Sequence, residues 1–335
     1  MFKEVIYLPG SQEIEIASFI KEYQNNSSEF SFFTSGSTGT PKKLIFSKDQ
    51  LDVSAKKSIT YFQLDESHTF YLCLDINTVA AKMLIVRAYL CGASLICGPV
   101  KKEINLPKEV KIDFISLVPI QLKFLIEKNI ESLRKSKILI GGASISTELI
   151  NQIVSLDLNC FQSFGMTETL SHVALRKISF PALPYQALSN IRFSISDTCL
   201  IIHYPELQDT PIVTNDEILL IDEQHFHWKG RRDFVVNSGG VKLHPADIED
   251  RIYENSGLKT LLFGISDNEL GEKLVMLVLT NNSINLQKSD FPFLLPFEIP
   301  KQYQCVASFF YLPNEKTDRI KTQLAIKENE WRTLL

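Results

Sequence analysis

The stretch TFYLCLDINTVAAKMLIVRAYLCGASLICG (residues 69–98) holds a short apolar run, a segment of helical length and a second apolar run. Lys82 and Arg87 interrupt the middle segment and Gly92 ends it, so we interpret it as a helix between two strands and not as a membrane span. Strands that alternate with helices indicate βαβ units around a mostly parallel sheet. The alternation of helical segments and apolar runs continues at residues 113–119, 120–129, 137–142, 145–154 and 158–164.

The pattern changes on both sides of this region. Before it, Ser-Lys-Asp-Gln at residues 47–50 has the spacing of a capping box, which predicts that a helix begins after Ser47. After Pro181, apolar and polar residues alternate between turn residues, and we expect an antiparallel β subdomain there. Its predicted strands lie at residues 191–196, 199–204, 217–222 and 225–230.

The last part of the chain has the features of a smaller domain that begins near Asp233. About 100 residues remain from there, which is enough for a small domain. Pro245 stands where it can open a helix over residues 246–255, and two apolar runs that follow predict strands. The predicted fold class is α/β, with a large domain and a small α+β domain at residues 1–232 and 233–335.

Composition and charge exclude several classes of function. Hydrophobic residues make up 44% and charged residues 22% of the 335 residues, as in an ordinary globular protein. The formal charge of −4 argues against nonspecific binding to nucleic acid, which requires a basic surface. The cysteines are scattered without a CxxC pair, and the N-terminal segment becomes charged too early for a signal peptide. We therefore expect reduced cysteines and a cytoplasmic protein.

The segment TSGSTGTPKK at residues 34–43 carries the strongest chemical signal. Its last eight residues contain three hydroxyl side chains, two glycines and two lysines. Glycine lets the backbone approach an anion closely, hydroxyl and amide groups donate hydrogen bonds to it, and lysine adds positive charge. The alternative is a flexible turn, for which the Pro-Lys-Lys ending has no use. The segment is not a Walker A loop, because Pro41 stands where that motif needs glycine.

This segment resembles the phosphate loop of the adenylate-forming superfamily of acyl- and aryl-CoA ligases. Three further segments match the same superfamily in the same order along the chain. QSFGMTET resembles its GMTET motif, TND resembles its TGD motif, and GRRDFVVNSGG resembles its GRxD hinge segment with the glycine loop behind it. These segments lie at residues 162–169, 214–216 and 230–240.

The resemblance implies a site for ATP and Mg²⁺. Thr167 would reach the α-phosphate, and Glu168 would hold Mg²⁺, a hard cation that prefers carboxylate and phosphate oxygens. Asp216 would accept hydrogen bonds from the ribose hydroxyls, with Arg231 as a cation beside it. Ser163 and Phe164 would line the adenine or acyl side, with core packing as the alternative for Phe164. The phosphates of ATP would be held by Thr34, Ser35, Gly36, Ser37, Thr38, Gly39 and Lys42.

The resemblance also implies two half-reactions, in which a carboxylate is first adenylated and then transferred to the thiol of coenzyme A. The small domain of the superfamily swings between these half-reactions, and Asp233 matches its hinge position. Gly239 and Gly240 would help to form the tunnel for pantetheine, because glycine permits close approach of the backbone.

The chain departs from the superfamily pattern in three places. Lys43 stands where members often carry glycine, and Asn215 replaces the glycine of TGD. The third departure lies near the C-terminus, where the superfamily places a lysine before isoleucine to bridge the carboxylate and the α-phosphate. Our hypothesis is that one of three neighbouring cations supplies this charge, namely Lys316, Arg319 or Lys321.

The acid is suggested by a finer resemblance. The phosphate loop comes early in this chain, and its compact form, with segments at residues 76–88, 117–121 and 165–176, resembles the o-succinylbenzoate–CoA ligases of the menaquinone pathway. That substrate has two carboxylates, so one is activated while the other needs an anchor. Arg87 is the first candidate for this anchor, with a helix-surface arginine as the alternative. Ser171 and His172 come next, although His172 also fits a structural histidine. The acyl group would lie against small residues, namely Gly141, Gly142, Ala143 and Gly165.

Several functions remain open from the sequence. The preferred one is an ATP-dependent, AMP-forming acid–CoA ligase that acts on o-succinylbenzoate. Another aryl- or acyl-CoA ligase, or an adenylation enzyme that loads the pantetheine of a carrier protein, would carry the same motifs. A member of the superfamily that binds nucleotide without turnover is the alternative from a different class. The expected partners are a small carboxylic acid, ATP and CoA, with no nucleic acid and no membrane span.

Overall fold

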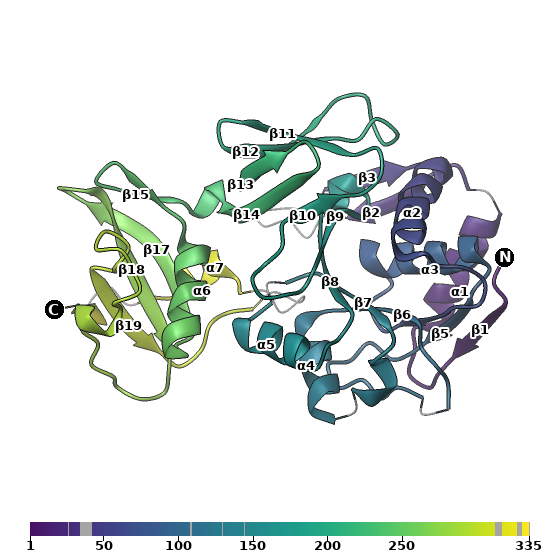
Figure 1. The fold of residues 1–335 in the computed structure, drawn as a ribbon, viewed down its shortest axis with the longest axis horizontal. Helices are drawn as coiled ribbons and strands as arrows, with labels where there is room; N and C mark the ends of the chain where they lie inside the picture. The colour runs from purple at the N-terminus through teal and green to yellow at the C-terminus, as the bar shows by residue number, and fades with distance from the viewer. Residues whose placement is uncertain are drawn as a thin grey trace.

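The computed structural model describes residues 1–25, 27–33, 42–107, 109–128, 130–143, 145–311, 317–326 and 330–334. Two extended sheets dominate these ranges, and the short helix η3 (Arg232–Phe234) lies between them (Figure 1). The larger sheet contains 12 strands and the smaller one six among the described residues. Along the chain, the last strand of the large sheet ends at Arg231 and the first strand of the small sheet begins at Val236. The predicted boundary at Asp233 therefore falls in η3.

One half of the large sheet is parallel, as the sequence predicts. All neighbours in this half pair in parallel. Its strands, in their order across the sheet, are β1 (Glu4–Tyr7), β5 (Ser94–Cys97), β4 (Thr69–Leu72), β6 (Phe114–Leu117), β7 (Lys137–Ile140) and β8 (Cys160–Gly165). The helices between them are α1 (Glu13–Gln24), α2 (Lys48–Phe62), α3 (Val79–Cys91), α4 (Pro119–Lys128) and α5 (Thr147–Ser155).

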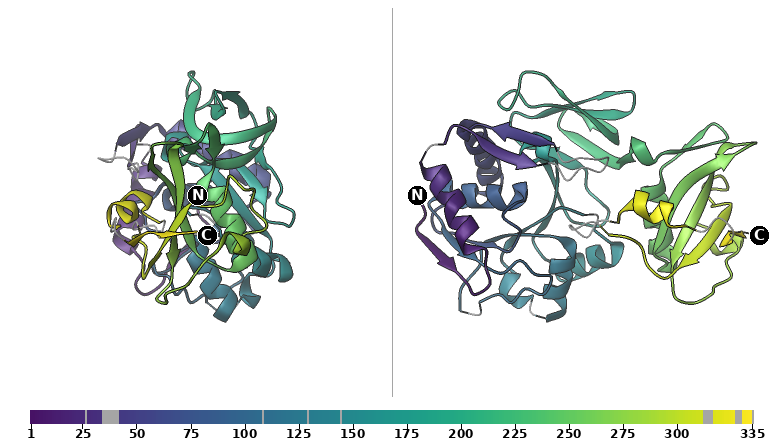
Figure 2. Two further views of the ribbon diagram at one scale, coloured as in Figure 1. Left: turned by 90° about the vertical axis from the view of Figure 1, so that its left-hand side faces the viewer. Right: turned by 180° about the vertical axis from the view of Figure 1, so that it is seen from behind.

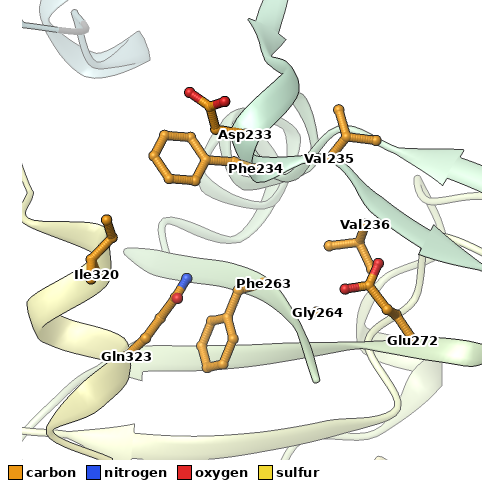
Figure 3. A pocket seen from close by; sticks show the side chains of 9 residues that line it. All are labelled: Asp233, Phe234, Val235, Val236, Phe263, Gly264, Glu272, Ile320 and Gln323. Carbon is orange, nitrogen blue, oxygen red and sulfur yellow. The ribbon is translucent and has the colours of Figure 1, made fainter. Parts of the chain in front are cut away.

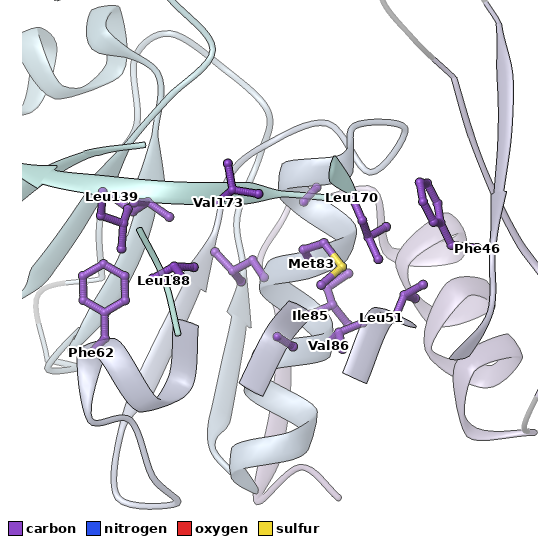
Figure 4. Packing of buried hydrophobic residues seen from close by; sticks show 14 of the residues in the cluster. Phe46, Leu51, Phe62, Met83, Ile85, Val86, Leu139, Leu170, Val173 and Leu188 are labelled. Atoms are coloured by element: carbon purple, nitrogen blue, oxygen red, sulfur yellow. The ribbon is translucent and has the colours of Figure 1, made fainter. Parts of the chain in front are cut away.

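These helices cover both faces of the parallel half, with α4 and α5 on one side and α1, α2 and α3 on the other (Figures 1 and 2). Because side chains alternate along a strand, Phe70 and Leu72 of β4 face α1 to α3, whereas Tyr71 faces α4 and α5. Met83 and Ile85 of α3 lie close to Leu51 of α2 (Figure 4). They also lie close to Leu170, which is in the connection after β8. Burial on both faces explains why these strands have continuous apolar runs.

The helix predicted between the first two apolar runs is α3, and Gly92 ends it in the left-handed conformation with φ of 71°. The strand β5 follows at once. No helix among the described residues is both long and apolar enough to cross a membrane. The interpretation of residues 79–97 as a helix followed by a strand is therefore confirmed.

The other half of the large sheet is antiparallel. The direction of pairing changes between β8 and β9 (His172–Lys177). Beyond β9 all neighbours pair antiparallel, which confirms the predicted antiparallel subdomain. The strands that follow β9 across the sheet are β10 (Tyr185–Ala187), β14 (His225–Arg231), β13 (Ile212–Asp222), β12 (Cys199–His203) and β11 (Arg192–Ser196).

The C-terminal part of the chain builds its own sheet and core. Pro245 occupies the first turn of α6 (Pro245–Ser256), as predicted, where its missing N–H costs no hydrogen bond. A second helix, α7 (Arg319–Leu324), lies near the end of the chain. The strands of this sheet are β15 (Val236–Ser238), β16 (Val241–Leu243), β17 (Thr260–Asp267), β18 (Gly271–Leu279), β19 (Gln302–Val306) and β20 (Arg332–Thr333).

The predicted capping box at the start of α2 is present. The Ser47 hydroxyl accepts a hydrogen bond from the Gln50 backbone N–H at 3.2 Å, and the Gln50 side chain accepts one from the Ser47 N–H at 2.8 Å. The Gln50 amide also donates to the Leu207 carbonyl at 2.6 Å, which ties this helix end to the antiparallel half.

Replacing Ser47 by alanine should lower the free energy of unfolding by about 1 kcal/mol, because a helix N–H loses its acceptor. Ser47→Asp, which keeps an acceptor, is the matched control and should retain nearly the wild-type value. Urea unfolding followed by circular dichroism measures both. Equal stability of Ser47→Ala and the wild type would contradict a role for this cap.

Candidate active site

The connection between β8 and β9 carries two of the predicted site residues. Its centre is the short helix η2 (Thr167–Thr169). The buried Thr169 hydroxyl donates to the Ser171 carbonyl at 2.6 Å and accepts from the Met166 N–H at 3.0 Å. This bonding fixes the turn, while Thr167 stays half-buried and Glu168 is exposed. An accessible carboxylate is the kind of ligand that Mg²⁺ prefers, and the roles of Thr167 and Glu168 stay predictions.

Gly165 is required at the end of β8 because the chain returns very close to it. A Cβ atom at this position would lie 2.5 Å from His172 Cα and closer still to the Ser171 carbonyl oxygen. Only glycine permits that approach. The absence of a side chain thus brings Ser171 and His172 against the end of the parallel half of the sheet.

Arg87 lies inside the protein and not on a helix surface, so the alternative reading of this residue is wrong. Arg87 is 1% exposed, and its Nη2 donates a hydrogen bond to Ser171 Oγ at 2.7 Å. Burial lowers the pKa of the guanidinium to about 10, which still leaves it charged at neutral pH. Among the described residues Arg87 forms no ion pair with a carboxylate, and its Nε has no hydrogen-bond partner. A buried cation of this kind invites an anionic ligand.

His172 joins the same group of side chains. Its Nε2 lies 2.9 Å from Ser58 Oγ and its Nδ1 lies 3.4 Å from Ser171 Oγ. Burial, and the positive charge of Arg87 next, hold the pKa of His172 well below its ordinary value of 6.5, so the ring is neutral at pH 7. We call these four residues, Ser58, Arg87, Ser171 and His172, the arginine cluster.

Sequence reasoning brought Arg87, Ser171 and His172 together and missed Ser58. Ser58 is fully buried on α2, one turn after Ser54, which is also buried. Two serines that face inward one turn apart on the same helix are a weak signal of polar contacts in the interior. Nothing in the sequence indicates that the contact is with His172, because 114 residues separate the two.

Asp216, the predicted ribose ligand, is a buried carboxylate on β13. Its Oδ1 accepts a hydrogen bond from Trp228 Nε1 at 2.8 Å, and its backbone N–H donates to Thr214 Oγ1 at 3.1 Å. Arg231 stands opposite it in the β13–β14 ladder. The guanidinium of Arg231, however, forms an ion pair with Asp233, with Nη2 and Oδ2 2.5 Å apart.

Asn215, which replaces the glycine of the TGD motif, contacts the predicted hinge residue through its side chain. Its side-chain amide donates to Asp233 Oδ1 at 3.1 Å, while Arg231 binds the other oxygen of the same carboxylate. Glycine cannot make such a bond. The predicted hinge residue is thus held at the end of β13 and β14 by an amide and a guanidinium.

The three candidate C-terminal cations differ in their surroundings. Lys316 lies outside the described residues. Arg319 donates to both carboxylate oxygens of Glu249 on α6, at 2.9 and 2.7 Å, and to the Leu262 carbonyl at 2.6 Å. It also lies over the ring of Phe234 in η3, 5.1 Å from the ring centre. Lys321 is exposed and lies 4.9 Å from the centre of the Phe310 ring. Arg319 therefore joins α7 to α6, β17 and η3.

A pocket of about 210 Å³ lies beside η3 in the C-terminal part (Figure 3). Phe234, Phe263 and Ile320 give it apolar walls, and Gln323 and Glu272 add polar groups. Of the predicted site residues that the structure describes, only Asp233 lines it. The pocket therefore lies at η3, beside the predicted hinge residue Asp233, and is separate from the arginine cluster.

The remaining predicted residues lie on elements around the end of β8. Ser163 donates to the Ile140 carbonyl at 3.0 Å, and the ring of Phe164 packs against Tyr185 and Phe226, which is core packing. Gly141, Gly142 and Ala143 follow β7 at its carboxyl end. In open α/β sheets, ligands bind at this edge, where the strand order or direction changes.

The predicted phosphate loop is framed by an antiparallel hairpin. Its strands β2 (Phe30–Phe33) and β3 (Lys43–Phe46) pair with Phe33 opposite Lys43. Thr34, Ser35, Gly36, Ser37, Thr38 and Gly39 lie outside the described residues, whereas Lys42 is described and exposed.

Gly239 and Gly240 form the two-residue turn between β15 and β16. Their φ angles are 58° and 81°, a left-handed pair that favours glycine at both positions of such a turn. The proposed pantetheine loop is therefore a tight hairpin.

Comparison with known proteins agrees with this geometry. A family model described as AMP-binding enzyme matches residues 15–206. A 2-succinylbenzoate–CoA ligase from Staphylococcus epidermidis is 26% identical over 324 residues, which cover 87% of this chain and 68% of that protein. An acyl-CoA synthetase (AMP-forming)/AMP-acid ligase II-like protein from Dyadobacter fermentans has a similar structure, with a TM-score of 0.61, 28% identity, and coverage of 92% of this chain and 93% of that one. The o-succinylbenzoate CoA synthetase from Bacillus subtilis in complex with its acyl-adenylate intermediate gives a TM-score of 0.76 at 19% identity, covering 91% of this chain and 69% of that one, and so shares the fold.

Because the His172 ring is buried in its neutral form, we expect the stability of the protein to depend on pH. Its pKa is depressed in the folded state, so the unfolded chain takes up a proton as the pH falls below 6.5 while the folded one does not. The contribution of His172 to the free energy of unfolding is therefore fully present above this pH and decreases below it, by up to about 1.4 kcal/mol per pH unit. Urea unfolding of the wild type and His172→Gln between pH 7.5 and about 5 measures this. The wild-type advantage should shrink on acidification, and parallel curves would contradict it.

The contacts of Arg319 predict a structural role. Arg319→Ala should lower the free energy of unfolding by about 2 kcal/mol, because Glu249 then lies half-buried without its cation. Lys321→Ala, an exposed change on the same helix, is the control and should stay within about 0.5 kcal/mol of the wild type. Unchanged stability of Arg319→Ala, with loss of acyl-adenylate formation, would instead assign the adenylation cation to Arg319.

Proposed function

The chain belongs to the AMP-binding enzyme family, and from this premise we propose that it is an ATP-dependent, AMP-forming acid–CoA ligase. The 26% identity to a 2-succinylbenzoate–CoA ligase supports this class of reaction. We further propose that its acid is an aromatic dicarboxylate, with o-succinylbenzoate as the best candidate.

The buried charge of Arg87 is the observation that carries the choice of acid. A guanidinium that lies in the interior without a carboxylate partner among the described residues is costly to the folded protein. A second carboxylate on the acid would neutralise it through charge-assisted hydrogen bonds in a site of low polarity. A monocarboxylic acid, whose only carboxylate is consumed in the reaction, would leave the charge unpaired. The arginine cluster therefore favours a dicarboxylate.

The first half-reaction joins the other carboxylate to the nucleotide. A carboxylate oxygen attacks the α-phosphorus of ATP, and pyrophosphate leaves. We propose that Thr167 binds the α-phosphate and that Glu168 holds Mg²⁺, which would neutralise charge on the phosphate oxygens. Asp216, fixed by Trp228, would orient the ribose. These residues position the reactants and need no covalent chemistry of their own.

The residues from Thr34 to Gly39, together with Lys42, would hold the leaving phosphates. The cation that bridges the carboxylate and the α-phosphate would come from Lys316 or Lys321. Arg319 is the weaker candidate for it, because both carboxylate oxygens of Glu249 bind its guanidinium.

The second half-reaction transfers the acyl group to sulfur. The thiol of CoA attacks the carbonyl carbon of the acyl-adenylate, and AMP leaves with the electron pair of the broken C–O bond. We propose that the part after Asp233 rotates between the half-reactions as a small domain and that the turn at Gly239 and Gly240 guides the pantetheine. The ion pair of Arg231 with Asp233 and the amide of Asn215 would restrain this hinge.

The reaction can be tested directly on the purified protein. It is incubated with ATP, Mg²⁺, CoA and o-succinylbenzoate, and AMP, pyrophosphate and thioester are assayed by mass spectrometry. Two analogues that each lack one of the carboxylates are the matched controls, together with a panel of monocarboxylic acids. AMP and the o-succinylbenzoyl thioester should form together. A thioester from a different acid only would overturn the substrate, and absence of AMP with every acid would overturn the ligase.

Arg87→Met should raise the KM for the dicarboxylate about 100-fold, since a neutral side chain of similar length cannot pair with a buried anion. The KM for ATP should change little, because the described hydrogen bond of Arg87 is with Ser171 and not with a proposed nucleotide residue. Arg87→Lys, which keeps a point charge, should fall between the two. Equal KM values for the acid in the wild type and Arg87→Met would remove Arg87 from the acid site.

A further inference from the structure

We propose that Ser58 holds the His172 ring in the tautomer with its hydrogen on Nδ1, and that this tautomer makes Ser171 a hydrogen-bond donor to the second carboxylate of the acid. Ser58 is then a positioning residue that acts through His172. The second half of this inference rests on the proposed function, whereas the first half concerns the protein alone.

The first step is the direction of the hydrogen bond between Ser58 and His172. Ser58 is 0% exposed, and its hydroxyl has one side-chain partner among the described residues, His172 Nε2 at 2.9 Å. If Nε2 carried the ring hydrogen, the Ser58 hydrogen would have no acceptor in a buried site, which is unfavourable. Ser58 therefore donates, and Nε2 accepts.

The second step follows from the charge of the ring. Burial and Arg87 keep His172 neutral, and a neutral imidazole carries one hydrogen. With Nε2 as acceptor, this hydrogen is on Nδ1, which faces Ser171 Oγ at 3.4 Å. Arg87 Nη2 donates to the same oxygen at 2.7 Å. Two donors then point at Ser171 Oγ.

The third step concerns the hydrogen of Ser171 itself. Its lone pairs are directed at Arg87 and His172, so its hydroxyl must donate to another acceptor, and none appears in the described part of the chain. The Nε–H of Arg87 is also buried and finds no acceptor among the residues that the structure describes. The arginine cluster thus offers two unpaired donors and a positive charge, which are the complement of a carboxylate.

The other tautomer would give a different site. Ser171 would donate to Nδ1 of His172 and would present only lone pairs to a ligand. Lone pairs repel a carboxylate, so the site would keep the charge of Arg87 and lose one of its two donors. Ser58 therefore contributes to the recognition of a dicarboxylate without touching it.

The tautomer can be read in the wild-type protein without any assay of activity. Ring nitrogens of ¹⁵N-histidine-labelled protein are detected by long-range proton–nitrogen correlation at neutral pH, and the signals that vanish in His172→Gln are assigned to His172. We expect a protonated Nδ1 and a bare Nε2. The reverse pattern, or a cationic ring, would overturn the proposal whatever the enzyme does.

Kinetics test the consequence for the acid. Ser58→Ala should shift His172 toward the other tautomer and raise the KM for the dicarboxylate about fivefold, with little change in the KM for ATP. The matched control is Ser54→Ala on the same helix, which is equally buried but bonds to Tyr204. It should leave the tautomer and the KM for the acid unchanged.

These outcomes separate the two proposals. An unchanged tautomer in a folded Ser58→Ala protein, or an equal rise of KM in Ser54→Ala, would overturn the role of Ser58. The expected tautomer in a protein that turns over no acid would overturn the proposed function and leave the control of His172 by Ser58 standing.

Discussion

The hydrogen bond of 2.7 Å between Arg87 and Ser171 lies in the interior of the large sheet's core, and the arrangement around it follows from the cost of burying a charge. A second positive charge beside the buried guanidinium of Arg87 would be unfavourable, and the ring of His172 is neutral. Ser171 reaches α3 and His172 reaches α2 because Gly165 allows the chain to return against the end of β8. The same return reverses the strand direction between β8 and β9 and forms the turn that presents Thr167 and Glu168. The proposed phosphate and metal residues, Thr167 and Glu168, thus lie on the same β8–β9 connection as Ser171, which contacts Arg87.

Two of the three departures from the superfamily pattern, Asn215 and the arginine at position 319, have contacts around η3. Asn215 and Arg231 both bind Asp233, and Arg319 binds Glu249 while it covers Phe234. Substitutions that seem unrelated in the sequence therefore lie on the two sides of η3. Glu217, which is buried on β13, adds to this group because Arg232 and His244 both approach its carboxylate. A chain segment held by several charged contacts moves only when these contacts are exchanged for others. If the proposed rotation at Asp233 takes place, these charged contacts would contribute to its energetic cost.

Much of the fold could be predicted because its signals are local. The alternation of apolar runs and helical segments from Thr69 onward predicted the parallel half, since such runs are buried on both faces. The capping box at Ser47, the end of α3 at Gly92 and the start of α6 at Pro245 are set by neighbouring atoms and were confirmed. Candidate site residues inside short motifs, such as Glu168 and Asp216, could be named from the resemblance of these motifs to the superfamily, and their roles stay predictions. Ser58 and Trp228 could not, because their partners lie elsewhere in the chain.

The sequence by itself determined the order of the elements and the family, and it named candidate residues for binding a nucleotide, a metal and an acid, because periodicity, turns and motifs depend on adjacent residues. Only the tertiary structure decided that Arg87 is buried without a carboxylate partner in the described part of the chain, that Ser58 bonds to His172, and that Arg319 is bound to Glu249. The physical reason is that burial and hydrogen-bond partners are properties of packing between segments. A helix pattern shows which face is apolar, but it does not show which polar group from another strand completes that face.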